Sequence, residues 1–121
     1  MSVYVDNMKA RVGRVVFCHC WADTLDELLE MMTVIGVQHK WIQGHQELSL
    51  PKYRNASWVH FDIVQSKRKL AVQAGAIETD KYGPLEHVAK LQIASGDPAK
   101  VKYGEEKLAI VKECRAKGFG Q

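Results

Sequence analysis

The chain is organised around residues 60–69, HFDIVQSKRK, which predict a short strand that runs directly into a helix. Side chains alternate along a strand, so His60 and Asp62 lie on one face of it. Ser66 is a suitable helix N-cap, and three cationic residues follow it at 67–69. Cations are unfavourable at a helix start, where unpaired N–H groups carry partial positive charge. The junction is therefore a candidate site for an anion.

Two strands and a first helix precede this unit. Residues 3–5 and 15–21 are apolar runs typical of strands, and the second is continuous enough to form the middle of a sheet. Thr24 and Glu27 form a capping box that starts a helix, and Gly36 ends it. The apolar residues of this helix repeat at helical spacing and are expected to face the sheet: Leu25, Leu28, Leu29, Met32 and Ile35.

Residues 38–57 show no periodicity and predict a long loop with a short turn of helix. Loops of this length are often functional. Trp41 in the loop and Trp58 just beyond it, with two histidines and several basic residues, suit a segment that contacts a ligand. Aromatic side chains that only pin the loop to the core explain the same composition.

The helix that begins at Ser66 is expected to end at Gly75, and residues 76–79 predict a last short strand. The apolar side of this helix consists of three residues, Leu70, Ala71 and Ala74.

After Asp80 the pattern becomes helical. Gly83-Pro84 predicts a helix start with proline in the first turn. Glu105-Glu106 predicts the start of a last helix, with acidic residues at its beginning and basic residues at its end.

These elements predict an α/β or α+β protein with a single small mixed sheet, packed helices and a helical C-terminal extension. Residues 1–80 are expected to form the core domain, and residues 81–121 the extension of the same domain. The extension is expected to pack on the core or to pair with another subunit, so a homo-oligomer is expected.

The composition is that of a globular protein, with 121 residues, 46% of them hydrophobic and 26% charged. No apolar run approaches the roughly 18–20 residues that span a bilayer, and no signal peptide is evident, so a cytoplasmic protein without a membrane partner is expected. Residues 61–121 hold eleven Lys and Arg against eight Asp and Glu and supply the net charge of +3, which favours a polyanionic partner.

The three cysteines form no CxxC pair. Cys18 and Cys20 lie on a predicted strand and are expected to be buried, reduced thiols. A zinc site would need further ligands at recognisable spacing, and the Cys-His-Cys run at 18–20 is too tight for a zinc finger.

A set of short motifs, in order along the chain, resembles a domain-of-unknown-function family of short proteins from bacteria and their phages. The motifs are YVDNM at 4–8, CH at 18–19 with ADT at 22–24, HFD at 60–62, and SKR at 66–68 with AGA at 74–76. The resemblance covers roughly residues 1–79 and implies a small α/β domain in a phage or bacterial setting, but no activity. Members often have Asp-Asp where this chain has Asp6-Asn7, which bears on any metal site that uses the second carboxylate.

The leading functional hypothesis is non-catalytic binding of a phosphate-bearing ligand, a nucleotide or nucleic acid, at the strand–helix junction. The predicted ligand-binding residues are Ser66, Lys67, Arg68, His60, Asp62, His19, Asp6, Trp41 and Trp58, the tryptophans by stacking on bases. One concrete form is sequestration of a host signalling nucleotide by a phage protein in the host cytoplasm, which is a counter-defence role.

Two alternatives stay open. The first is a metal-dependent phosphoesterase or nuclease, in which Asp6, His19, His60 and Asp62 bind Mn, Mg or Zn; His60 and Asp62 are then the candidate catalytic residues. No HExxH motif, P-loop or paired DxD supports this alternative. The second is a module that binds a protein partner, such as a host factor, through residues 81–121.

Overall fold

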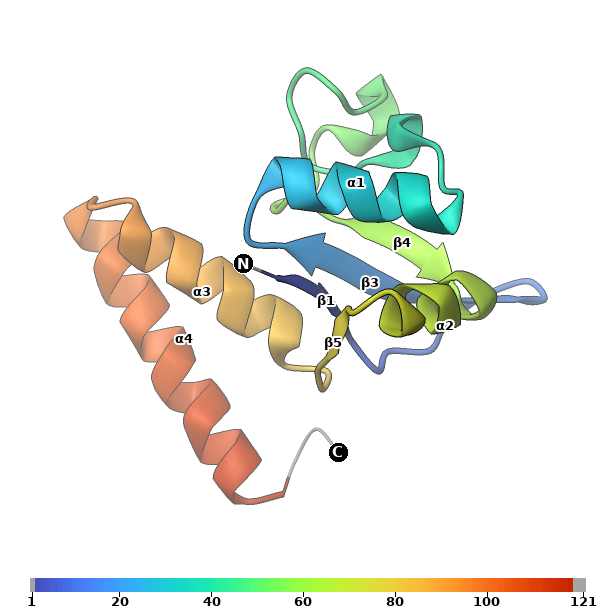
Figure 1. The fold of residues 1–121 in the computed structure, drawn as a ribbon. Coiled ribbons are helices and arrows are strands. Elements are labelled where there is room, and N and C mark those ends of the chain that lie inside the picture. Colours follow the sequence, from blue (N-terminus) through green and yellow to red (C-terminus); the bar gives the residue numbers. More distant parts are fainter. Residues whose placement is uncertain (1, 119–121) are drawn as a thin grey trace. The chain divides into compact units, whose positions relative to one another are not determined.

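A computed structural model describes residues 2–118, which divide into two compact units between Thr79 and Asp80 (Figure 1). The first unit contains a single mixed sheet of five strands with packed helices, and the second contains helices. The predicted fold class is confirmed. Within the described residues, every helix falls short of the length and apolar character that crossing a membrane requires.

The sheet is built around its longest strand, β3. Three strands pair with β3 in antiparallel fashion, and β5 pairs in parallel with β1. The strands are β1 (Val3–Val5), β2 (Ala10–Val12), β3 (Val15–Ala22), β4 (Phe61–Val64) and β5 (Ile77–Glu78). The predicted central position of residues 15–21 is confirmed.

The register places β1 and β2 on one side of β3 and β4 on the other. Cys20 lies opposite both Val5 of β1 and Phe61 of β4, and Phe17 lies opposite Ala10 of β2 as well as the last residue of β4. Strand β4 is therefore an edge strand along these positions. The loop that precedes it is joined to it by one further antiparallel bridge, between Gln43 and His60.

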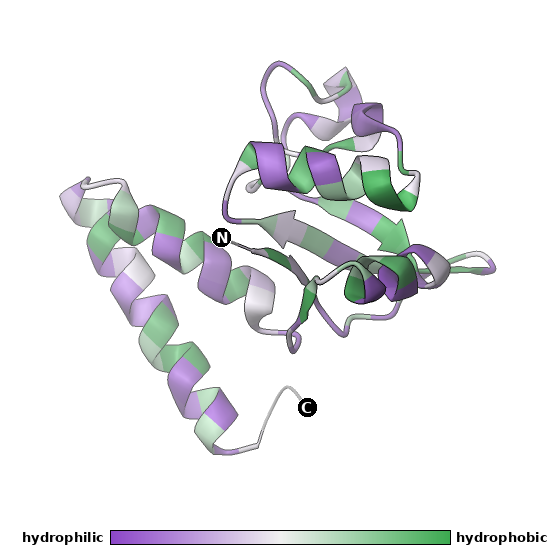
Figure 2. Cartoon of the chain, viewed as in Figure 1, coloured by the Kyte–Doolittle hydropathy of each residue, from purple (hydrophilic) through white to green (hydrophobic). Residues whose placement is uncertain are grey.

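Helix α1 (Leu25–Ile35) forms as its capping box predicts. The hydroxyl of Thr24 accepts a hydrogen bond from the Glu27 N–H at 3.3 Å and donates one to the Glu27 carboxylate at 2.8 Å. Gly36 ends the helix in the left-handed conformation, with φ of 78°. Hydrophobic and hydrophilic residues alternate along α1 (Figure 2), and its buried residues are Leu28, Met31, Met32 and Ile35.

One face of the sheet packs against α1 and α2 (Gln65–Gln73) and forms the core. The strand residues in this core alternate in the sequence: Val3, Val5, Cys18, Cys20, Phe61 and Ile63. Because strand side chains alternate between faces, His19 and Asp62 lie on the opposite face. These two residues are directly paired across β3 and β4, which sets the position of the candidate site.

The predicted strand-to-helix run at residues 60–69 is confirmed, but the prediction that Ser66 caps the helix is wrong. Pairing of β4 with β3 continues to Val64, so the helix starts at Gln65, and Val64 is the N-cap without a capping side chain. Ser66 is exposed within the first turn. The predicted apolar side is also only partly correct, since Ala71 is buried whereas Leu70 is 43% exposed.

The predicted loop at residues 38–57 is confirmed, with two short 3-10 turns, His39–Trp41 and Pro51–Tyr53. The buried hydroxyl of Ser49 donates a hydrogen bond to the Ile42 carbonyl oxygen at 2.8 Å. Ile42 itself is fully buried in the core. The loop is therefore held to the core through Ile42, and its middle is tied to Ile42 by Ser49.

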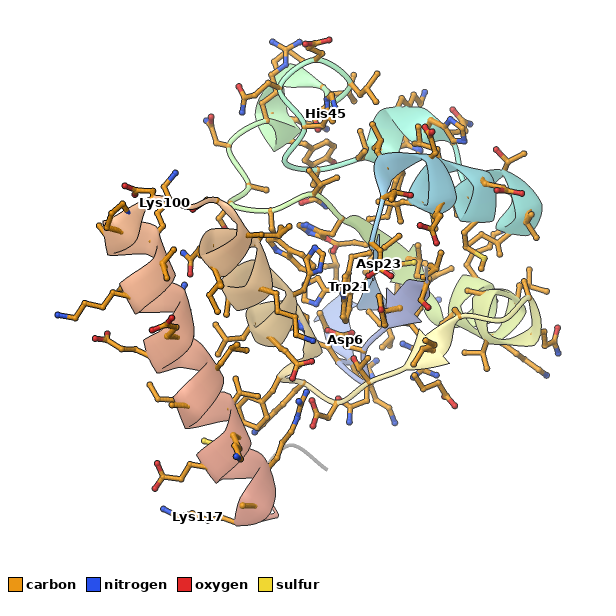
Figure 3. The ribbon with its side chains drawn as sticks, turned by 60° about the vertical axis from the view of Figure 1, so that its left-hand side comes forward. Asp6, Trp21, Asp23, His45, Lys100 and Lys117 are labelled. Carbon is orange, nitrogen blue, oxygen red and sulfur yellow. The ribbon has the colours of Figure 1, made fainter. Side chains whose placement is uncertain are left out.

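The second unit is a helical hairpin of α3 (Gly83–Ala94) and α4 (Pro98–Ala116). The predicted start of α3 is confirmed. The predicted start of the last helix at Glu105-Glu106 is wrong, because α4 already begins at Pro98; Figure 3 labels Lys100 near its start and Lys117 at its end.

An ion-pair cluster joins the two ends of the second unit. Arg115 donates hydrogen bonds to both carboxylate oxygens of Asp80, at 2.8 and 2.9 Å, and also to Glu86. The bonds to Arg115 lower the pKa of Asp80 despite the opposing effect of burial. This bidentate pair fixes the end of α4 to the residues that precede α3.

A close contact with α3 explains why a glycine, Gly104, lies within α4. A Cβ atom at this position would lie 2.6 Å from the carbonyl oxygen of Ala89 in α3, so the two helices approach each other closely here. Such contact requires a residue without a side chain.

We expect Gly104→Ala to destabilise the protein by about 1–3 kcal/mol through overpacking, although alanine is the better helix former by about 1 kcal/mol. Urea denaturation followed by circular dichroism measures the change. Glu105→Ala, at an exposed neighbouring position, serves as the control and should change stability by less than about 0.5 kcal/mol. An increase in stability for Gly104→Ala would contradict the close helix contact.

Candidate metal centre

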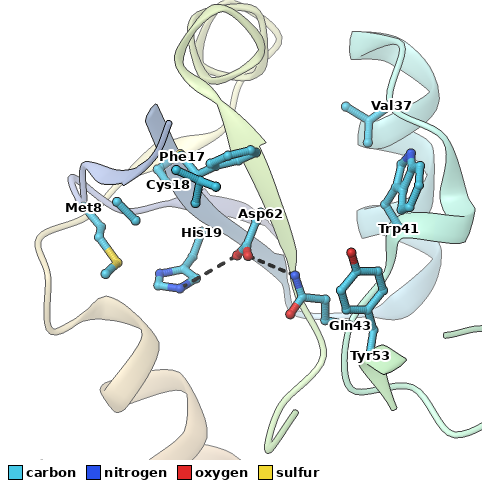
Figure 4. A pocket seen from close by; sticks show the side chains of 11 residues that line it. Met8, Phe17, Cys18, His19, Val37, Trp41, Gln43, Tyr53 and Asp62 are labelled. Carbon is cyan, nitrogen blue, oxygen red and sulfur yellow. Dashed lines mark hydrogen bonds and ion pairs between the residues drawn. The ribbon is translucent and has the colours of Figure 1, made fainter. Parts of the chain in front are cut away.

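Two histidines and one carboxylate converge on the face of the sheet opposite α1 and α2. His19 from β3, Asp62 from β4 and His60 just before β4 bring one ligand atom each to within 4.8 Å of one another. The Asp62 Oδ1 atom lies 3.4 Å from His60 Nε2 and 3.9 Å from His19 Nε2. Figure 4 shows Asp62 between His19 and Gln43, with its carboxylate directed toward both.

Asp6, which follows β1, contacts the ring of His19 on the side away from Asp62, at Nδ1. Its carboxylate is only 1% exposed and accepts hydrogen bonds from His19 Nδ1 at 2.7 Å and from the His19 N–H at 2.9 Å. A carboxylate oxygen accepts, so Nδ1 is the donor of this bond, and Nε2 faces Asp62. The hydrogen bond to Asp6 raises the pKa of His19 against the opposing effect of burial.

A backbone carbonyl orients the ring of His60 so that its Nε2, like that of His19, faces Asp62. Its Nδ1 atom lies 3.1 Å from the carbonyl oxygen of Trp58, which can only accept, so Nδ1 is again the donor. The imidazole stacks on the indole of Trp58 with ring centroids 4.2 Å apart and an interplanar angle of 14°. The side chain of His60 is 7% exposed, so its ring has little freedom to turn away.

Gln43 holds the carboxylate of Asp62 by donating from Nε2 to Oδ2 at 2.9 Å. Burial raises the pKa of Asp62, but hydrogen bonds from His60 and Gln43 and the nearby imidazoles outweigh it, and the pKa is lowered. Asp62 is therefore ionised at neutral pH. No sequence pattern predicts that Gln43 belongs to the site, because it reaches Asp62 through the bridge between the loop and His60.

The arrangement requires a positive charge at its centre. The hydrogen bond from His60 to Asp62 requires a proton on His60 Nε2. Without protons on the Nε2 atoms, two imidazole lone pairs and the carboxylate would repel one another unless a metal ion lies between them. A histidine that donates its other N–H to a carboxylate or a backbone carbonyl is the usual arrangement of a metal-binding imidazole. The residues therefore have the chemistry of a divalent metal site.

A cavity of about 440 Å³ adjoins Asp62. The loop at residues 38–57 supplies part of its wall, opposite residues from β2 and β3 (Figure 4). Its lining is mostly apolar and aromatic: Met8, Ala10, Val12, Phe17, Cys18, His19, Val37, Trp41, Gln43, Tyr53 and Asp62. The predicted site residue Trp41 thus shares one cavity with His19 and Asp62.

The structure brings only some of the sequence-predicted site residues together. Asp6, His19, His60 and Asp62 form one cluster, with Trp58 stacked on it. Residues 66–68 form no part of this cluster or of the cavity beside Asp62.

The cations of residues 66–68 have structural contacts of their own. Arg68 donates to the Asp6 carbonyl oxygen at 2.9 Å and to Glu78 at 3.0 Å. The Lys67 ammonium lies beside Gly36, where α1 ends and a cation is favourable. Anion binding at residues 66–68 stays a prediction.

The thiols of Cys18 and Cys20 are unsuited to nucleophilic chemistry. Burial, the largest effect for both, raises each pKa to about 12, so almost no thiolate exists at neutral pH.

We expect a thiol reagent such as DTNB to modify the half-buried Cys114 first, and Cys18 and Cys20 only as the protein unfolds. Cys114→Ser should abolish the first phase; a rapid phase that persists in this variant would contradict the burial.

Comparisons with known proteins identify a family but no characterised relative. No curated protein and no solved structure matches the chain. A family described as "Protein of unknown function (DUF4031)" matches residues 3–91, which confirms the resemblance to a domain-of-unknown-function family. The match extends into α3, so the expectation that it ends near residue 79 is wrong. The chain belongs to the DUF4031 family.

Proposed function

We propose that this protein is a divalent-metal-dependent phosphoesterase whose metal is held by His19, His60 and Asp62. The observation that carries the proposal is the convergence of two oriented imidazole Nε2 atoms on one ionised carboxylate. Three protein ligands leave coordination positions open for water and substrate, as in catalytic rather than structural metal sites.

The spacing of the ligand atoms supports this assignment. Bond lengths of about 2.0–2.1 Å separate the ligand atoms of a tetrahedral zinc site by about 3.3 Å. The separations from Asp62 Oδ1 are 3.4 Å to His60 and 3.9 Å to His19, so small side-chain shifts suffice. Two histidines and one carboxylate suit Zn, Mn or Fe(II) in general.

The chemistry follows from this ligand set. A bound Zn²⁺ would lower the pKa of a coordinated water to about 7, and any of these divalent ions would stabilise charge that develops on a phosphoryl oxygen. Asp6, the Trp58 carbonyl and Gln43 hold the three ligands in position, which limits reorganisation during the reaction. The side chains of Lys40 and Lys52 lie over the rings of Trp41 and Tyr53, 4.9 and 5.0 Å from the centroids, and their positive charge favours an anionic substrate.

The test is hydrolysis of bis(p-nitrophenyl) phosphate by chelator-treated protein supplied with Mn²⁺, Zn²⁺ or Mg²⁺. We expect activity with at least one metal, loss of this activity in Asp62→Ala, and full activity in His39→Gln, which changes an exposed histidine outside the cluster. Absence of hydrolysis with every metal would refute the proposed reaction.

Non-catalytic binding of a nucleotide or nucleic acid at residues 66–68 is a second candidate. Two observations favour it: α2 begins without a capping side chain, and Gln65 Nε2 is buried without a hydrogen-bond partner. Lys67→Ala should abolish binding of such a ligand and leave the fold intact. Arg68→Ala is less suitable, because it also removes the hydrogen bonds to Asp6 and Glu78. Sequestration of a host nucleotide, a phage origin and a homo-oligomer stay predictions.

A protein-partner role for the C-terminal helices is favoured by exposed apolar side chains. Leu91, Tyr103 and Ile110 are 51%, 56% and 55% exposed. Exposed apolar surface can mark an interaction site. Size-exclusion chromatography with light scattering tests self-association through these helices, and Ile110→Lys should disrupt it.

A further inference from the structure

We propose that the cavity beside Asp62 binds an uncharged nucleobase, which makes a nucleotide the substrate of the phosphoesterase. This inference rests on the proposed function for the reaction, but the base-binding site can be tested without any catalysis. The cavity and the candidate metal centre share His19 and Asp62, so a base in the cavity would place its attached phosphate within reach of the metal.

The size and lining of the cavity suit a flat apolar ring. Its volume of about 440 Å³ lies within the range of roughly 300–1,000 Å³ that small-molecule sites occupy. Trp41 and Tyr53 form adjacent aromatic walls, with ring centroids 6.4 Å apart at 70°. Trp41 is 40% exposed and Met8 is 42% exposed, so the lining includes apolar surface that a ligand ring would cover.

Gln43 provides a polar group that can recognise the edge of a base. Its Nε2 donates to Asp62, which fixes the direction of the amide and leaves Oε1 as the acceptor. Its backbone N–H and carbonyl are both hydrogen-bonded to the backbone of His60, so both the backbone and the side chain of Gln43 are held in place. An amide oxygen accepts from an exocyclic amino group or ring N–H, which nucleobases carry and aliphatic groups lack.

The distribution of charge favours the base inside the cavity and the phosphate outside it. Among the described residues that line the cavity there is no lysine or arginine. A phosphate inside the cavity would therefore find no cationic side chain in the lining. The metal, with Lys40 and Lys52 over the aromatic rings, supplies positive charge outside the lining instead.

The test compares adenosine 5′-monophosphate with ribose 5-phosphate, which has a hydroxyl group in place of the base, by calorimetric titration of the full chain with and without Mn²⁺. We expect the nucleotide to bind about 5- to 150-fold more tightly, the range that stacking of one base on aromatic side chains supplies. Trp41→Ala should reduce this ratio toward 1. Leu48→Ala, which removes an exposed apolar side chain of the same loop outside the cavity, should leave the ratio unchanged.

Equal affinities for the two compounds, or no binding of either, would overturn the base site. A ratio that survives in Trp41→Ala would also overturn it; should that variant fail to fold, Tyr53→Leu gives the same measurement. Failure of the phosphoesterase is seen separately, as absence of bis(p-nitrophenyl) phosphate hydrolysis in protein that still prefers the nucleotide.

Discussion

Replacing His60 with glutamine is expected to weaken binding of Zn²⁺ or Co²⁺ by at least about 100-fold, because loss of a direct ligand should match or exceed the 10- to 100-fold cost of losing a residue that only orients one. Thermal denaturation with and without metal measures the effect. In the wild type, metal at about 100 times its Kd should add roughly 2.7 kcal/mol to the free energy of unfolding.

This experiment separates a metal site from a hydrogen-bonded structural cluster. A structural role for His60 predicts that His60→Gln lowers the melting temperature equally with and without metal. A ligand role predicts that the metal-induced increase disappears, whatever the change in the metal-free protein. His39→Gln, at an exposed position, should retain the full metal-induced increase. A metal-induced increase that persists in His60→Gln would refute the assignment of this ligand.

The variant Asp6→Asn is expected to weaken metal binding by about 10- to 100-fold without removing any ligand. Asp6 fixes the proton of His19 on Nδ1, since its carboxylate oxygen lies 2.7 Å from that atom. In the variant, the amide oxygen can keep the bonds from the His19 and Met8 N–H groups, which turns the NH₂ group toward Nδ1. The proton of His19 then moves to Nε2, where it blocks coordination.

Nitrogen-15 NMR of the histidine side chains measures this tautomer directly. We expect His19 to change from the Nδ1-protonated to the Nε2-protonated form in Asp6→Asn, and the metal affinity to fall in parallel. Asp23→Asn, which alters an exposed carboxylate bonded to Tyr4 at 3.1 Å, should change neither. Unchanged metal affinity in Asp6→Asn would show that Asp6 does not position His19 for a metal.

Local signals allowed the first helix and the central strand to be predicted from the sequence. The capping box of Thr24 and Glu27 and the glycine at 36 act within a few residues of each other, so the helix start and end are encoded locally. The start of α4 could not be predicted in the same way. Gly104 argues against a helix interior in the sequence, and only its contact with Ala89 explains its presence there.

The candidate site was predictable only in part. Alternation along β4 places His60 and Asp62 on one face from the sequence alone. The position of His19 opposite Asp62 depends on strand register, which residues distant in the sequence determine. Gln43 reaches the site through a bridge from an aperiodic loop, and no local pattern indicates it.

The most direct measurement is an anomalous difference map from crystals of the protein loaded with Co²⁺ or Zn²⁺. We expect a single strong peak about 2.0–2.2 Å from His19 Nε2, His60 Nε2 and a carboxylate oxygen of Asp62. A peak at another position, or no peak at this cluster under saturating metal, would contradict a metal centre on this face of the sheet.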